Sequence, residues 1–259
     1  MESRQNSVCV KHLIHITWRN KETLKMNIGG FQKNSLIDFP ETIACILFTQ
    51  GCNFICPYCH NPDLVPGPQK RAGNLYDENK IFEFLEKRKG FIEGVVITGG
   101  EPTLQKDLMI FCKKVKKMGY KLKLDSNGTR PHILAALFEE NLIDFISMDI
   151  KTSLEKYHLV VQGKFDIQKI YDSSRLLMEK APAYEFRTTC ARPFVSREII
   201  KNIGEMISGA STYILQKCSQ NVNVLDPEFL KKETHFFSDS QMLELKETID
   251  KYVGVSVVR

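Results

Sequence analysis

The alternation of apolar and polar positions along this 259-residue chain predicts strands and helices in regular succession. Short apolar runs rich in β-branched and aromatic residues are typical of buried strands. Such runs span residues 43–49, 95–98, 121–125, 145–150, 184–189 and 212–216. Longer segments with apolar residues at helical spacing alternate with them, at 77–89, 105–118, 131–141, 166–180, 196–208 and 238–252.

Local signals at the ends of the helical segments agree with this division. Pro131 stands in the first turn of its segment, and Asp77 and Ser196 are suitable N-caps. Strands that each precede a helix predict parallel pairing through right-handed crossovers. We therefore expect an α/β fold in a single domain, with a parallel sheet closed into a partial barrel of six βα units.

The first residues differ from the rest of the chain, because Met26 begins a stretch that reads as the start of the compact domain. We predict an N-terminal extension over residues 1–25 and a core domain over 26–259. A chain with 42% hydrophobic residues at this length can bury a full core. No apolar run approaches membrane-spanning length, so we expect no membrane association.

The net charge of +5 is mild, and much of it falls in one lysine-rich stretch. Its members are Lys113, Lys114, Lys116, Lys117, Lys121 and Lys123. A solvated helix face is one interpretation, and a docking site for an acidic redox partner is the other. Tyr120 is the one aromatic residue among these lysines, so nucleic-acid binding is not expected.

The densest chemical signal is Cys52, Cys56 and Cys59 at C-x₃-C-x₂-C spacing, followed by Gly99-Gly100-Glu101-Pro102. Three thiolates can hold three irons of a cubane cluster and leave the fourth iron open to a chelating small molecule. A structural zinc site is the alternative, because the adjacent His60 completes a Cys₃His set. The side chains of sequence neighbours ordinarily diverge, which disfavours a single tetrahedral ion.

The other cysteines are scattered singly, at Cys9, Cys45, Cys112, Cys190 and Cys218. Because the chain shows no secretory signal, a disulfide framework is not expected. We interpret these five as buried or inert thiols. Such cysteine usage predicts a reducing compartment, the cytoplasm.

Polar residues gather where the predicted strands end, and ligands of parallel α/β sheets bind beyond the carboxyl ends of the strands. The residues at these ends include Gln50, Glu101, Asp125, Ser126, Asn127, Asp149, Lys151, Arg187, Thr189 and Gln216. We expect them to meet the cysteine loop at one edge of the sheet.

The cysteine motif, with Tyr58 before its last cysteine, and the later Gly-Gly-Glu-Pro resemble the signature of radical S-adenosylmethionine (SAM) enzymes. The stretches 37–40, 48–52 and 58–63 are similar to those of activating enzymes of glycyl-radical enzymes. Within that group the resemblance is greatest to the activating proteins of anaerobic ribonucleoside-triphosphate reductase. It extends from about residue 26 to about residue 226.

The resemblance implies a 4Fe–4S cluster held by Cys52, Cys56 and Cys59, with S-adenosylmethionine at the open iron. The residues implied in binding S-adenosylmethionine are Tyr58, Gly99, Gly100, Glu101, Asp125, Ser126, Asp149, Lys151 and Arg187. The two glycines would let backbone carbonyls approach the ammonium group of the ligand, and Glu101 would add a charge-assisted hydrogen bond.

Asp38 matches an aspartate that lies near the docked glycine loop in these activating enzymes. An aspartate before a proline-containing bend is equally a turn initiator, and both interpretations stay open. The implied function is an activase that reductively cleaves S-adenosylmethionine and generates a glycyl radical on a partner enzyme. Anaerobic ribonucleotide reductase is the expected partner, and a flavodoxin or ferredoxin is the expected electron donor.

Two other functions remain open from the sequence. One is a radical SAM enzyme acting on a small molecule, similar to 7-carboxy-7-deazaguanine synthase. The other is a non-catalytic module with a closed Cys₃His zinc site.

Overall fold

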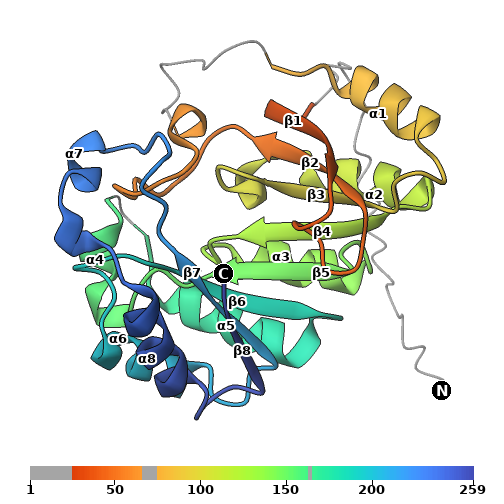
Figure 1. Cartoon of the computed structure of the whole chain (residues 1–259). Helices are drawn as coiled ribbons and strands as arrows, with labels where there is room; N and C mark the ends of the chain where they lie inside the picture. The colour runs from red at the N-terminus through yellow and green to blue at the C-terminus, as the bar shows by residue number, and fades with distance from the viewer. Residues whose placement is uncertain (1–24, 66–74, 163–164) are drawn as a thin grey trace, which may run out of the picture.

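A computed structural model describes residues 25–65, 75–162 and 165–259. An eight-stranded sheet runs through it in the order β1 to β8 (Figure 1). β1 (Ile28–Ser35) is antiparallel to β2 (Ala44–Thr49), and each later strand is parallel to the one before it. The later strands are β3 (Gly94–Gly99), β4 (Lys121–Ser126), β5 (Phe145–Asp149), β6 (Tyr184–Cys190), β7 (Thr212–Lys217) and β8 (Val255–Val258).

Helices make the crossovers between the parallel strands. They are α1 (Glu78–Lys87), α2 (Leu108–Lys117), α3 (Pro131–Glu139), α4 (Tyr157–Val160), α5 (Gln168–Lys180), α6 (Arg197–Met206), α7 (Pro227–Leu230) and α8 (Asp239–Ile249). Short 3₁₀ turns span Pro62–Leu64, Pro102–Leu104, Leu154–Lys156 and Glu233–His235. None of the helices in the described ranges is both long enough and apolar enough to cross a membrane.

The predicted partial barrel is confirmed, because the six predicted strands correspond to β2–β7 and a helix follows each of them. The predicted caps are also present: the side chain of Asp77 accepts a hydrogen bond from Asn79 N, and that of Ser196 accepts one from Ile199 N. Pro131 begins α3. These local signals work because each one satisfies an otherwise unpaired backbone N–H or places a proline where no N–H is needed.

Two strands were not predicted. β1 carries glycines and polar residues without clear alternation, and β8 is only four residues long. Both lie at the edges of the sheet, where one partner strand suffices and the sequence signal is weak. The predicted extension over 1–25 lies outside the described residues except for Lys25, so that boundary stays a prediction.

The sheet has two different faces because alternate side chains of a strand point in opposite directions. The face that carries Leu47, Ile97 and Leu124 joins the large apolar core beneath the helices. The opposite, inner face has only a small apolar cluster near the beginnings of the strands, with Phe39, Ile46 and Val96 among its members. Toward the carboxyl ends of the strands the inner face carries charged and neutral polar side chains, among them Thr98, Asp125 and Arg187, so the interior of the partial barrel suits a polar ligand.

Candidate active site

A cavity of about 330 Å³ lies on the inner face and reaches the carboxyl ends of β2–β7. It is lined by every residue that the sequence assigned to the site: Asp38, Cys52, Cys56, Tyr58, Cys59, Gly99, Gly100, Glu101, Asp125, Ser126, Asp149, Lys151 and Arg187. The strand-end residues Asn127, Thr189 and Gln216 line it as well. The parallel sheet thus brings together side chains that are far apart in the sequence, as strand ends in such sheets do.

The cysteine loop follows β2 and is fixed at its base by backbone hydrogen bonds. Gly51 N donates to Leu64 O at 2.7 Å, and Cys59 N donates to Cys56 O at 3.1 Å. Burial raises the pKa of Cys52 to about 12 and that of Cys56 to about 11. These thiols therefore ionise readily only when a bound metal compensates the charge of the thiolate.

The arrangement of the thiols bears on the choice between a cluster and a zinc ion. Across the described ranges, no three histidine, cysteine, aspartate or glutamate side chains converge where they could hold one metal ion. The cysteines of a cubane cluster bind separate irons, so they surround the cluster and do not meet at one point. The three cysteines and His60 all line the cavity, so the choice between the two sites rests on the family to which the chain belongs.

Gly99 and Gly100 close the end of β3 onto the base of the cysteine loop. Gly99 has a φ of +105°, and a Cβ there would come within 2.6 Å of Thr49 N. A Cβ on Gly100 would lie 2.1 Å from Gly51 O. The glycines are thus required by contact with the chain's own backbone. This reason is additional to the one inferred from the sequence, the approach of backbone carbonyls to the ligand, which stays a prediction.

Glu101 is 1% exposed and clamps the end of β3 to the end of β4. Its Oε1 accepts hydrogen bonds from Thr103 N at 3.0 Å, Thr103 Oγ1 at 2.5 Å and Ser126 Oγ at 3.0 Å. Its Oε2 accepts one hydrogen bond, from Asn127 N at 2.7 Å. Burial raises the pKa of Glu101, although these donors oppose the shift. Oε2 has a lone pair left for a ligand, so the hydrogen bond to the ligand's ammonium stays a prediction.

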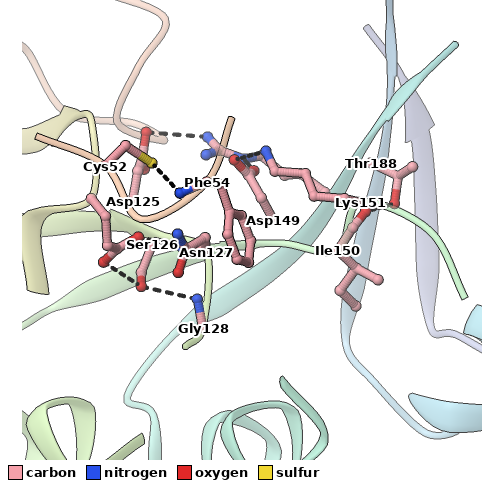
Figure 2. A network of polar contacts seen from close by, with 12 residues as sticks. Cys52, Phe54, Asp125, Ser126, Asn127, Gly128, Asp149, Ile150, Lys151 and Thr188 are labelled. Carbon is pink, nitrogen blue, oxygen red and sulfur yellow. Dashed lines mark hydrogen bonds and ion pairs between the residues drawn. The ribbon is translucent and has the colours of Figure 1, made fainter. Parts of the chain in front are cut away.

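An ion-pair chain crosses the neighbouring strand ends in the order Lys123, Asp125, Arg187, Asp149 and Lys151. Its N···O distances, in that order, are 2.5, 3.3, 2.9 and 3.0 Å. Figure 2 shows Asp149 and Lys151 beside Asp125, with Cys52 and Phe54 close to them. The chain joins β4, β5 and β6 through charges of alternating sign.

The cations of this chain determine the charge of its carboxylates. Loss of water raises the pKa of Asp149, but Arg187 and Lys151 outweigh that effect and hold the pKa well below its ordinary value. Arg187 and Lys123 lower the pKa of Asp125 against the same desolvation. Both carboxylates stay ionised, and Arg187 and Lys151 retain N–H groups for a ligand, which suits a carboxylate or hydroxyl.

Tyr58 adds an apolar wall with one polar atom. Its ring centre lies 5.7 Å from that of Phe194 and 5.9 Å from that of Phe229. Its hydroxyl is buried and has no hydrogen-bond partner among the described residues. Buried hydroxyls are ordinarily paired, so this one fits a site that is completed by a ligand.

Several residues of the site were missed from the sequence. Asn53, inside the cysteine loop, donates to Thr129 Oγ1 at 2.9 Å and accepts from Asn127 Nδ2 at 2.8 Å, which ties the loop to the end of β4. Phe54 lines the cavity and packs against Tyr157. No periodic signal marks either residue, although Asn53 lies between two predicted ligands.

The lysine-rich stretch is divided in the structure: Lys113, Lys114, Lys117 and Lys121 are exposed, as a solvated face requires, whereas Lys116 and Lys123 are not. Lys123 is 2% exposed and points along the inner face of β4, while Lys116 pairs with Asp144 at 2.7 Å. The exposed members, such as Lys113, lie on α2 toward its end, and α2 runs back from the carboxyl end of β3 to the beginning of β4. The exposed lysines therefore lie toward the amino ends of the strands, whereas the cysteine loop follows the carboxyl end of β2, and docking of an electron donor on them stays a prediction.

Asp38 lies in the loop between β1 and β2, close to the beginning of β2, because Ser35 pairs with Ala44. The cysteine loop follows the other end of β2, so the cavity extends along the inner face between them. Ser35 Oγ donates to Asp38 Oδ2 and accepts from Ile37 N and Asp38 N. The turn is therefore organised by Ser35, and the carboxylate of Asp38 lines the cavity.

Comparison with known proteins decides the family. Residues 46–193, more than half of the chain, match the family described as the Radical SAM superfamily. This chain belongs to the radical SAM superfamily. As a member it uses a 4Fe–4S cluster and S-adenosylmethionine, and the three cysteines and the polar cavity described above fit that pair of cofactors.

Two curated relatives narrow the similarity. The "Putative glycyl-radical enzyme activating enzyme" of Methanocaldococcus jannaschii is 30% identical over 241 residues, which is 91% of this chain and 97% of that protein. The pyruvate formate-lyase-activating enzyme of Listeria monocytogenes is 35% identical over 148 residues, 53% of this chain and 58% of that one. The first similarity is nearly complete in both chains, and the second covers just over half of each.

Solved structures confirm the fold. SuiB of Streptococcus suis bound to the precursor peptide SuiA has a TM-score of 0.62 and 13% identity, covering 83% of this chain and 48% of SuiB. TYW1 with a lysine-pyruvate adduct has a TM-score of 0.53 and 16% identity, covering 81% of this chain and 74% of TYW1. At these identities the likeness concerns the arrangement of strands and helices alone.

Proposed function

We propose that this protein is an activating enzyme that generates a glycyl radical on a partner enzyme, with anaerobic ribonucleoside-triphosphate reductase as the first partner to test. The observation that carries the proposal is the similarity over 91% of the chain to a relative with that activity in its name. When bound, the cofactors supply the chemistry: one electron from flavodoxin or ferredoxin cleaves the carbon–sulfur bond of S-adenosylmethionine, and a hydrogen atom passes from a glycine Cα to its 5′-carbon, leaving methionine, 5′-deoxyadenosine and a glycyl radical.

The chain's own residues have four tasks in this proposal. Cys52, Cys56 and Cys59 hold the cluster, and Glu101 keeps the strand ends in register beneath it. Arg187 and Lys151 orient the polar groups of S-adenosylmethionine with the N–H groups that the ion-pair chain leaves free. The surrounding aromatic side chains exclude water from the reacting atoms.

The substrate side of the proposal is supported by the loop between β1 and β2. Leu36 and Ile37 are 76% and 85% exposed, although the next residue, Asp38, lines the cavity. Phe39 is buried against the inner face and anchors the turn. An anchored turn therefore exposes two large apolar side chains to water, an arrangement that suits contact with a protein surface. We propose that Leu36 and Ile37 contact the segment of the partner that contains the radical glycine.

The deciding experiment mixes anaerobically reconstituted protein with S-adenosylmethionine, a reductant and a candidate partner. We expect a doublet electron spin resonance signal on the partner and oxygen-dependent cleavage of its chain at the radical glycine. Asp38→Asn should bind both cofactors and lose most of this signal. If no glycyl-radical enzyme is activated but a small molecule is consumed with release of 5′-deoxyadenosine, the small-molecule alternative replaces the proposal. Tightly bound zinc without iron would support the non-catalytic module.

A separate experiment tests the proposed contact of Leu36 and Ile37 with the partner. Changing Leu36 and Ile37 together to Ser should lower the activation rate at limiting partner by about tenfold or more, because each buried side chain of this size is worth about 1.5–3 kcal/mol. Affinity for S-adenosylmethionine should not change. The matched control is Ile110→Ser with Leu243→Ser, two side chains exposed by 49% and 55% on the outer helices. An equal loss of activation in this control would remove the β1–β2 loop from the partner surface.

A further inference from the structure

Lys123 is a buried lysine that the mechanism has not used. It is 2% exposed, with its Nζ 2.5 Å from Asp125 Oδ1 and 5.9 Å from the centre of the Phe145 ring. Lysine is almost never fully buried unless it is paired, because its ammonium group loses strong hydration. A lysine kept in this position is therefore best explained by the group it holds.

The two oxygens of Asp125 have different partners. Oδ1 is 2.5 Å from Lys123 Nζ, and Oδ2 is 3.3 Å from Arg187 Nη1. Arg187 is held a second time, because its Nε donates to Asp149 Oδ1 at 2.9 Å. The guanidinium thus lies between two carboxylates, one of which is oriented by Lys123. Without Lys123, the carboxylate of Asp125 could rotate toward Arg187 with both oxygens or turn into the cavity.

Lys123 differs from the other four members of the ion-pair chain in its position. Asp125, Asp149, Lys151 and Arg187 all line the cavity, whereas Lys123 lies on the inner face one pleat earlier on β4 and does not. It therefore has no direct route to a ligand. Any influence on ligand binding must pass through Asp125, the neighbour with which it forms an ion pair.

We propose that Lys123 is a positioning residue for S-adenosylmethionine, which holds Oδ1 of Asp125 so that Oδ2 fixes Arg187 with its free N–H groups toward the cavity. The role is a specific one: Lys123 sets the orientation of the carboxylate, and the carboxylate sets the orientation of the guanidinium. It concerns the ligand common to the superfamily and does not depend on the partner protein. The outcome is therefore separate from the test of glycyl-radical formation.

A double-mutant cycle tests the route through Asp125. The proteins are wild type, Lys123→Met, Asp125→Asn and the double variant, all reconstituted anaerobically and matched for iron and sulfide. Their affinity for S-adenosylmethionine is measured by calorimetric titration. We expect each single change to weaken binding by about tenfold or more, since each removes a charge-assisted contact. The double variant should bind as well as Asp125→Asn alone, because residues that act through one another are not additive.

Lys121→Met is the matched control, two residues earlier on the same strand. Lys121 is exposed, and its Nζ lies 3.9 Å from Glu93 Oε2, a long and solvated ion pair. It should retain wild-type affinity within about twofold. The proposal would be overturned if Lys123→Met bound S-adenosylmethionine as tightly as the wild type. It would also be overturned if adding Lys123→Met to Asp125→Asn weakened binding as much as Lys123→Met weakens it in the wild type. If Lys123→Met does not fold, a double variant that binds more weakly than Asp125→Asn would still overturn the proposal, because the carboxylate through which Lys123 is proposed to act is absent from both proteins.

Discussion

Glu101 and Asp149 are carboxylates on the wall of the same cavity, and their surroundings give them opposite properties. Within the described part of the chain, Glu101 receives its hydrogen bonds from neutral donors, namely Thr103, Ser126 and the backbone of Asn127. Asp149 is held by two cations, Arg187 and Lys151. Accordingly the pKa of Glu101 is raised and that of Asp149 is lowered. Desolvation acts on both, so the charge of the partners decides the direction.

The difference suggests that Glu101 and the ion-pair chain have separate roles in the site. The Glu101 clamp joins two strand ends and has nearly exhausted its hydrogen-bonding capacity, which suits a structural support. The ion-pair chain keeps unused donors on Arg187 and Lys151, which suits ligand binding. Four predictions test this division, in order of decreasing effect.

Arg187→Met should have the largest effect, because it leaves Asp125 and Asp149 in the cavity without their shared cation. Removal of one partner from a buried ion pair costs about 3–5 kcal/mol of stability. Affinity for S-adenosylmethionine should fall as well, since the remaining N–H groups of the guanidinium, which orient the ligand in the proposal, are lost. Urea unfolding and anaerobic titration measure the two effects. Arg175→Met, on an exposed i,i+4 pair with Glu179, should change stability by less than about 0.5 kcal/mol.

Glu101→Gln should destabilise the protein by about 1–3 kcal/mol, because the amide places an N–H₂ group against at least one of the existing donors. Urea unfolding of the reconstituted protein gives this value. Iron content should remain that of the wild type. A tenfold loss of ligand affinity at unchanged stability would instead assign the carboxylate mainly to the ligand.

The two carboxylates should give stability opposite dependences on pH. The pKa of Glu101 is 4.5 in the unfolded chain and higher in the folded protein. Between these two values the carboxyl is protonated only in the folded protein, so its contribution to stability falls as pH rises through this range. Below its ordinary pKa of 3.8, Asp149 is protonated in the unfolded chain first, so its contribution is complete above that value and is lost as pH falls. Unfolding of wild type, Glu101→Gln and Asp149→Asn from about pH 3 to about pH 7 measures both. Parallel profiles for the two variants would contradict the assignment.

Thr103→Val should have the smallest effect, since it removes one of the donors of Glu101 and leaves the backbone N–H of residue 103 in place. We expect a loss of about 1 kcal/mol in stability. Ligand affinity should be unchanged, which a titration checks. A larger loss of affinity than of stability would show that the clamp and the ligand site are not separable.

The sequence by itself determined the parts of this protein that depend on local chemistry. The spacing of Cys52, Cys56 and Cys59 fixes three thiols in one loop, and Asp77 and Ser196 cap their helices through backbone groups two or three residues away. The sequence alone assigns the strand-end residues to one site, because parallel strands place their carboxyl ends along one edge.

The tertiary structure decided the features that depend on neighbours distant in sequence. The edge strands β1 and β8 exist because partner strands complete their hydrogen bonds, although their own patterns are weak. Lys123 belonged by sequence to a run of surface lysines, and only the pleat of β4 and the acid beside it place it inside the barrel. The spacing of Lys123 two residues before Asp125 was the available signal, since such residues share a face.

Gly99, Gly100 and Glu101 illustrate the same limit. Their motif identified the site, but their physical roles depend on contacts with Thr49, Gly51 and the end of β4. Conformation, charge and hydrogen bonding at a strand end are set by whatever packs against it. The sequence therefore specified which side chains meet, and the packing of the strands decided which of them support the site and which remain free to bind.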